Sequence, residues 1–119
     1  MKSRFVFAAF AIIVALAPVQ SAHATLNRIY EKTAQSGKPT RLFSFFNCGR
    51  HVIAIARGAF VEHGTIEYKD ATQKRCGNAD EPVVEVWYTS NPGFVGVDVV
   101  TMPMGATQFF ITHVAVGPQ

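Results

Sequence analysis

Thioether and imidazole side chains gather near the C-terminus of this 119-residue chain. Met102 and Met104 supply two sulfurs, and His113 supplies an imidazole further along. Both kinds of ligand suit Cu(I), so a copper-handling protein is one alternative function. Methionine is also a routine core filler, and His51 and His63 have no further ligands at metal-binding spacing. We therefore interpret all these residues as structural and predict no metal site and no cofactor.

Carboxylates are the other side chains that could do chemistry. A glycosidase needs two carboxyl groups that face each other across a cleft, and calcium needs six or more oxygen ligands. Most of the acidic residues fall in expected turns or on polar strand faces, which favours solvated or turn-capping roles. The chain also has no G-x-S-x-G, no H-E-x-x-H and no phosphate-binding glycine loop. We predict no catalytic residue and keep a small exported enzyme as an alternative. The acidic residues weighed are Glu62, Glu67, Asp70, Asp80, Glu81, Glu85 and Asp98.

Two cysteines, Cys48 and Cys76, are the only ones in the chain. An even count in an exported protein indicates a disulfide. A metal or redox pair is the alternative, but a zinc site needs four ligands at tight spacings, and the chain has no C-x-x-C. We predict one disulfide between these two residues.

The N-terminus has the three zones of a secretory signal. Lys2 and Arg4 come first, an apolar run follows from Phe5 to Leu16, and Ala22 and Ala24 fit the small positions before a cleavage site. The apolar run is shorter than the roughly 20 residues that span a bilayer. We predict that residues 1–24 are removed, that no transmembrane anchor remains, and that the protein is exported to the periplasm or outside the cell.

The charge balance argues against a nucleic-acid partner. The whole chain has 11 basic and 8 acidic residues. Cleavage would remove the two basic residues of the signal and no acid, leaving 9 against 8, a net charge of +1. Nucleic-acid binding needs a clustered basic face, which this balance does not indicate.

The remaining residues, 25–119, read as one all-β domain of about six to seven strands. Short β-branched or aromatic runs alternate with turn residues, which is typical of a sandwich. Residues 25–37 fit a short helix, an edge strand or a frayed terminus. Residues 69–82 are polar and without periodicity, so we expect a long loop there. The expected strands are 41–48, 51–59, 64–68, 83–89, 97–102 and 108–116.

Three stretches together resemble bacterial Ig-like, cadherin-like repeat domains. They are HGTI at residues 63–66, WYTS at 87–90 and PGFVGVDVV at 92–100. Val97 and Val100 depart from the Thr and the aromatic residue usual in those repeats. The resemblance implies an Ig-like β-sandwich and says little about activity, because such domains serve adhesion, spacing and binding alike.

The third stretch reads as a structural turn. Pro92 presets one φ and Gly93 accepts a positive one, and Phe94 supplies apolar mass under the corner. Gly96 gives a second bend, for which we expect a positive φ. Asp98 can accept hydrogen bonds from nearby backbone amides and fix the corner.

An aromatic run begins at Leu42, and successive strand residues face opposite ways. If Leu42, Phe46 and Cys48 point to the core, then Phe43 and Phe45 point away from it. Either the N-terminal segment covers these two rings, or they form a patch that binds a partner. Our leading interpretation is a non-catalytic binding or structural module whose partner is a protein or an envelope component.

Overall fold

The computed structural model describes residues 12–15 and 26–119, and within them it contains strands and no helix. The all-β class predicted from the sequence is confirmed. The predicted signal, residues 1–24, lies outside the described residues except for 12–15. The strands are β1 Leu26–Gln35, β2 Thr40–Phe45, β3 Gly64–Arg75, β4 Asn78–Ser90, β5 Gly96–Pro103 and β6 Gln108–Gly117.

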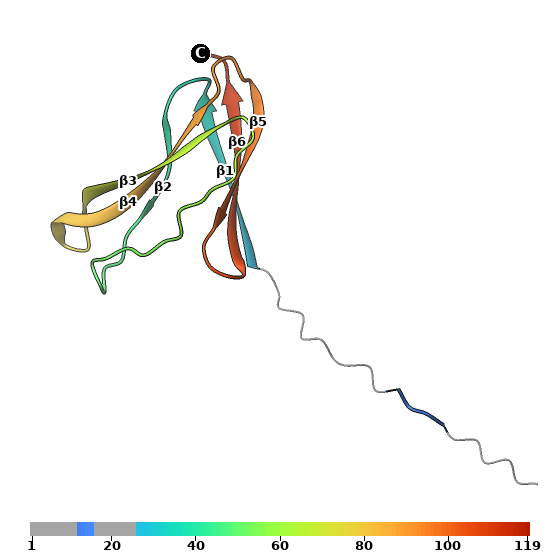
Figure 1. Cartoon of the computed structure of the whole chain (residues 1–119). Helices are drawn as coiled ribbons and strands as arrows, with labels where there is room; N and C mark the ends of the chain where they lie inside the picture. Colours follow the sequence, from blue (N-terminus) through green and yellow to red (C-terminus); the bar gives the residue numbers. More distant parts are fainter. Residues whose placement is uncertain (1–11, 16–25) are drawn as a thin grey trace, which may run out of the picture.

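The strands form two three-stranded sheets, in the orders β1-β6-β5 and β2-β4-β3 (Figure 1). β1 runs parallel to β6, and the other pairs are antiparallel. Residues 25–37, which the sequence left open, therefore become an edge strand from Leu26 onward. Its end is fixed to β6 because the Ser36 amide donates to the carbonyl of Gly117 at 2.8 Å.

The core lies between the two sheets. Alternate residues of each strand point inward, as the two-residue period of a strand requires, and the facing side chains interdigitate. The β2-β4-β3 sheet contributes Leu42, Val86 and Tyr88, and the other sheet contributes Val100, Met102, Val114 and Val116.

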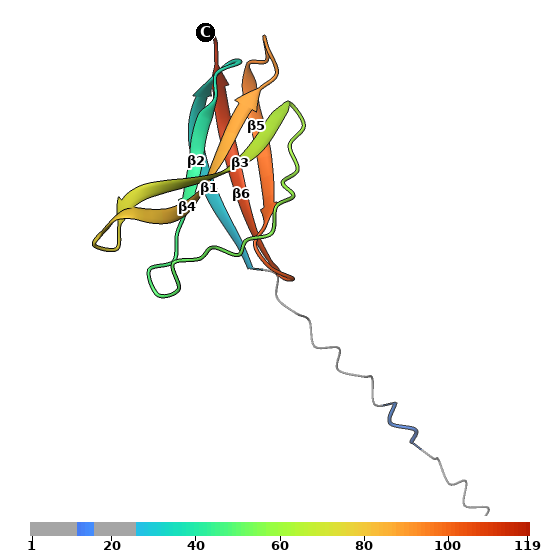
Figure 2. The ribbon, with the colours of Figure 1, turned by 60° about the vertical axis from the view of Figure 1, so that its left-hand side comes forward.

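The long loop expected over residues 69–82 is wrong, because these residues extend β3 and β4 into a hairpin. Arg75 pairs with Asn78, which leaves Cys76 and Gly77 as a two-residue turn. Both have positive φ, 56° and 68°, as a type I′ hairpin turn requires. Figures 1 and 2 show this end of the hairpin extending away from the rest of the sandwich. An extended arm has little core to cover, so its residues are polar and the apolar alternation of a strand is missing.

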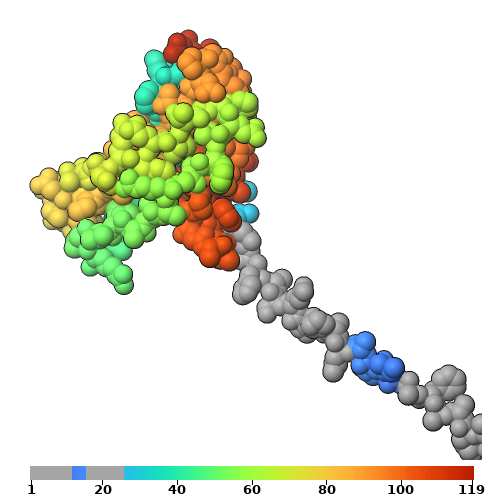
Figure 3. Space-filling view, in the orientation of Figure 1, coloured from blue at the N-terminus to red at the C-terminus, as the bar shows by residue number. Residues whose placement is uncertain are grey.

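The strand expected over residues 51–59 is also wrong. This segment runs irregularly from the hairpin arm toward β5, across the face shown in Figure 3. Only Phe60 reaches a ladder, through an isolated antiparallel bridge with Thr101 of β5. The β-branched residues predicted a strand, but a strand also needs a neighbour to pair with, and this segment gains one only at its end.

The disulfide between Cys48 and Cys76 is confirmed, with the two Cα atoms 5.4 Å apart. It joins the turn after β2 to the tip of the β3–β4 hairpin. The disulfide therefore attaches the arm to the start of the irregular segment.

Candidate functional site

Four rings form a cluster that joins the two sheets, and we call it the aromatic cluster: Tyr30, Phe43, Phe45 and Phe110. Tyr30 meets Phe43 edge-on at 5.0 Å between ring centroids and lies 5.1 Å from Phe110. Phe43 stacks on Phe45 at 5.7 Å. All four side chains are half-buried, so each ring keeps one part on the core and another part accessible.

A bulge in β2 sets the orientation of these rings. The register with β4 shifts between Arg41 and Phe43, so Leu42 is buried and Phe43 and Phe45 also turn toward the core cluster. Phe46, which we expected in the core, is 42% exposed. The orientation predicted from strict alternation is therefore wrong, because one extra residue in a strand inverts the faces that follow it.

A cation lies beside the aromatic cluster. The Lys32 ammonium is 5.6 Å from the centroid of Phe43, within the range of a cation–π contact. Tyr30 of β1 packs against Phe43, so the N-terminal strand covers part of the pair that we predicted to bind a partner. The partner-binding role of Phe43 and Phe45 stays a prediction.

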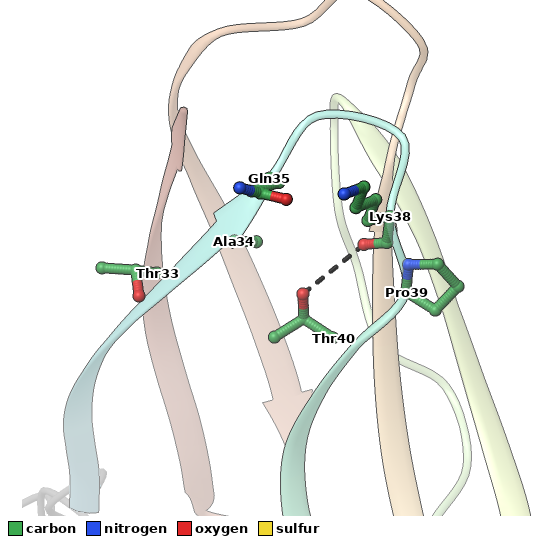
Figure 4. A pocket seen from close by; sticks show the side chains of 6 residues that line it. All are labelled: Thr33, Ala34, Gln35, Lys38, Pro39 and Thr40. Carbon is green, nitrogen blue, oxygen red and sulfur yellow. Dashed lines mark hydrogen bonds between the residues drawn. The ribbon is translucent and has the colours of Figure 1, made fainter. Parts of the chain in front are cut away.

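An open hollow lies between β1 and β2 beyond the aromatic cluster (Figure 4). Among its lining residues, the Thr40 hydroxyl donates to the carbonyl of Lys38 at 3.4 Å, and the Lys38 amide donates to the carbonyl of Gln35 at 3.1 Å. The hollow has no acid or histidine in its lining, so it offers no carboxylate or imidazole to act as a general base. The residues that line it are Thr33, Ala34, Gln35, Lys38, Pro39 and Thr40.

His51 and Glu81 form a pair that sequence reasoning missed. His51 Nδ1 lies 2.8 and 2.7 Å from the two carboxylate oxygens of Glu81. The Glu81 side chain has no exposed surface, whereas that of His51 is 52% exposed. A carboxylate can only accept, so Nδ1 carries the proton of this bond. Thirty residues separate the pair in the chain, and no local motif signals it.

The surroundings of this pair decide what it can do. A shallow hollow beside His51 is lined mainly by apolar residues such as Val52 and Val84, with Asp70 at its edge. Asp70 is engaged by Arg57 at 2.8 Å. No Ser, Thr or Cys lines this hollow, so the histidine has no nucleophile there to activate.

The predicted turn residues lie together at one end of the sandwich. The Phe94 amide donates to the carbonyl of Asn91, which closes a turn with Gly93 at φ 83°. Gly96 has the expected positive φ, 143°. Asp98 is buried and accepts a hydrogen bond from the Tyr88 hydroxyl at 2.7 Å. Burial and this carboxylate raise the pKa of Tyr88 above its ordinary value.

The candidate copper ligands do not converge. Met102 is buried on the inner face of β5. His113 belongs to the opposite face, because its neighbours Thr112 and Val114 are the buried residues of β6. Met104 follows β5 and packs partly against the core. Among residues 12–15 and 26–119, no group of three His, Cys, Asp or Glu side chains is placed to hold a metal ion.

The part of the chain that the structure describes contains no helix long and apolar enough to cross a membrane. Comparison of the sequence and structure with protein-family models, curated proteins and solved structures found no match.

Proposed function

We propose that this protein is an exported, non-catalytic binding module with an Ig-like sandwich, which recognises a protein or envelope partner through the aromatic cluster. The observation that supports this proposal is the half-exposed position of Tyr30, Phe43, Phe45 and Phe110 where the two sheets meet. Aromatic anchors carry a large share of binding energy at interfaces. The Cys48–Cys76 disulfide is compatible with export.

The charge of the module favours recognition by apolar contact. Residues 26–119 carry 9 Lys and Arg against 8 Asp and Glu, a net charge of +1. Such a balance gives little long-range steering of a charged partner. The partner should therefore bring an apolar or aromatic segment, with Lys32 available to a carboxylate beside Phe43.

The test compares capture by variants that keep the fold. Phe43 and Phe45 pack partly on the core, so we replace both by Leu, which removes the rings and keeps apolar bulk. Tagged protein is used to recover partners from an envelope fraction, followed by mass spectrometry. We expect the double variant to lose the partner that the wild type enriches.

The matched control is Phe94→Leu, the same change at a half-buried ring in the turn before β5. This variant should still capture the partner, and its melting temperature should stay close to that of the wild type. If the double variant captures the same partner as the wild type, the aromatic cluster is not the binding site.

A small exported enzyme is the second candidate, and the His51–Glu81 pair is the observation that favours it. A carboxylate that orients an imidazole is the arrangement of a general base. Chromogenic esters and glycosides test this candidate directly. Turnover that His51→Gln removes would favour the enzyme over the binding module.

A further inference from the structure

The outward faces of the two sheets have opposite character. The outer face of β2-β4-β3 is polar, and hydrogen bonds link its side chains. Arg41 donates to Glu85 at 2.8 Å, and Gln73 donates to the same carboxylate at 3.0 Å. The Arg41 hydrogen bond lowers the pKa of Glu85. Lys69 lies 5.0 Å from the centroid of the Trp87 ring. These charged and polar side chains suit this face to contact with water.

The outer face of β1-β6-β5 exposes a group of apolar side chains around Glu31 and His113, and we call it the apolar face. In the ladders of this sheet, Ile29 stands beside Ile111, and Val97 stands beside Ala115. Ile29 is 64% exposed, Val97 63% and Val99 42%. The other side of the same strands forms the core, so this sheet carries apolar side chains on both faces. Its outward apolar residues are Ile29, Val97, Val99, Phe109, Ile111 and Ala115.

Exposed apolar side chains grouped on one face of a sheet mark an interface. We propose that the apolar face packs against the apolar face of a second copy of this chain, forming a symmetric dimer. Two sheets with apolar faces pack about 10 Å apart at a small angle, as the sheets of a sandwich do. A twofold axis brings the same face of each copy together and needs no other surface.

The polar groups of the apolar face fit this arrangement. Glu31 and His113 are direct neighbours across the β1–β6 ladder. A twofold axis that passes between them places each Glu31 beside His113 of the other copy. The carboxylate accepts hydrogen bonds and the imidazole can donate one, so the face is complementary to itself. The net charge of +1 on residues 26–119 adds little repulsion between copies.

The size of the face sets the strength of the dimer. Three strands about 4.8 Å apart and about eight residues long give a face of roughly 14 by 26 Å. This gives about 360 Å² on each copy, less than half of the about 800 Å² that a standard interface buries on each partner. We therefore expect a weak dimer, with a dissociation constant of about 100 μM.

The test is sedimentation equilibrium of protein purified, with its disulfide intact, from cells that express the full-length chain. We expect monomer and dimer in equilibrium at about 300 μM protein. Ile29→Lys combined with Val97→Lys should raise the dissociation constant at least tenfold, because both lysines would be buried at the interface. Both positions are exposed in the single copy, so the melting temperature of the monomer should stay the same.

The control is Thr65→Lys, an exposed position of β3 on the polar outer face, which should leave the dissociation constant unchanged. A chain that stays single up to about 1 mM would overturn the proposal, and so would a dimer that both lysines leave intact. A lipid surface is the other candidate partner of the apolar face, and phosphatidylcholine vesicles test it. If the wild-type chain stays single and binds these vesicles, and the lysine variant does not bind them, the apolar face is a lipid-binding surface and the dimer proposal is rejected.

Discussion

Gly96 shows how one residue fixes the corner before β5. Its φ of 143° lies where residues with a side chain are rarely found. A Cβ added there would meet only the Phe94 ring, at 3.5 Å or more, so the cost of a side chain lies in the backbone. We expect Gly96→Val to lower the free energy of unfolding by about 1–3 kcal/mol, measured by urea denaturation.

Gly105 provides the comparison for this substitution. It has no positive φ, and an added Cβ would meet nothing within 4 Å. Gly105→Val should therefore cost much less than Gly96→Val. Equal losses of stability in the two variants would show that backbone strain does not decide the effect.

The buried Tyr88–Asp98 hydrogen bond makes stability depend on alkaline pH. Burial and Asp98 raise the pKa of Tyr88, and burial raises that of Tyr68. In the unfolded chain tyrosine titrates near pH 10. The stabilisation is thus fully present below about pH 10, and it is lost as the pH rises from there toward the higher pKa of the folded state. Urea denaturation at pH 8 and pH 11 should show this fall in stability.

Tyr88→Phe separates this contribution from that of Tyr68. At neutral pH the variant leaves one oxygen of buried Asp98 without its donor, so we expect a loss of about 1–3 kcal/mol. Between pH 8 and pH 11 the variant should lose less stability than the wild type, because one of the two perturbed tyrosines is gone. The same slope in both proteins would assign the alkaline effect to other groups.

Several links tie the segment after β2 to the β3–β4 hairpin, and one of them is the His51–Glu81 pair. His51→Ala leaves the buried Glu81 carboxylate without its closest partner. We expect a loss of about 1–3 kcal/mol. Adding Glu81→Gln removes the charge that has lost its partner, so the double variant should recover part of this stability. A double-mutant cycle measures the coupling, and a coupling energy near zero would contradict the pairing.

The disulfide is another of these links, and it closes a sequence separation of 28 residues. Replacing Cys48 and Cys76 by Ala should lower the free energy of unfolding by about 2–4 kcal/mol. Non-reducing peptide mapping of the wild type should find one linked pair. Two thiols that react with an alkylating reagent in unreduced protein would contradict this pairing.

The strands were predictable where the local sequence pattern agrees with the position of the segment against the core. Five of the predicted strands overlap β2 to β6, because their residues alternate against one core. The hairpin arm of residues 69–82 was missed because it leaves that core and its residues are polar. The side chains of residues 51–59 predict a strand because side-chain type indicates β propensity, whereas pairing depends on which strand lies alongside.

The candidate site was only partly predictable for a similar reason. The turn around Gly93 and Gly96 follows from local conformational rules, so residue types were enough to find it. The inward orientation of Phe43 depends on a bulge against β4, and the burial of Glu81 depends on His51 approaching from another loop. The apolar face appears only when β1 and β5 are both placed beside β6.

At the scale of the whole molecule, the predicted cleavage site and the start of the fold coincide. Cleavage after Ala24 would leave Thr25 as the first residue, and β1 begins at Leu26, whose amide donates to the carbonyl of Thr107 at 2.9 Å. The cleaved chain would thus keep all of the strand that pairs with β6. We expect mass spectrometry of protein purified from full-length expression to find Thr25 at its N-terminus.

Ala24→Phe is the variant that tests this prediction, because a signal peptidase needs a small residue directly before the cut. The variant should retain residues 1–24 and stay bound to the membrane fraction. A chain expressed without residues 2–24 should remain in the reducing cytosol with Cys48 and Cys76 as free thiols. Purified wild-type protein that still begins at Met1, or a disulfide that forms equally well without the N-terminal segment, would show that export does not determine the mature form.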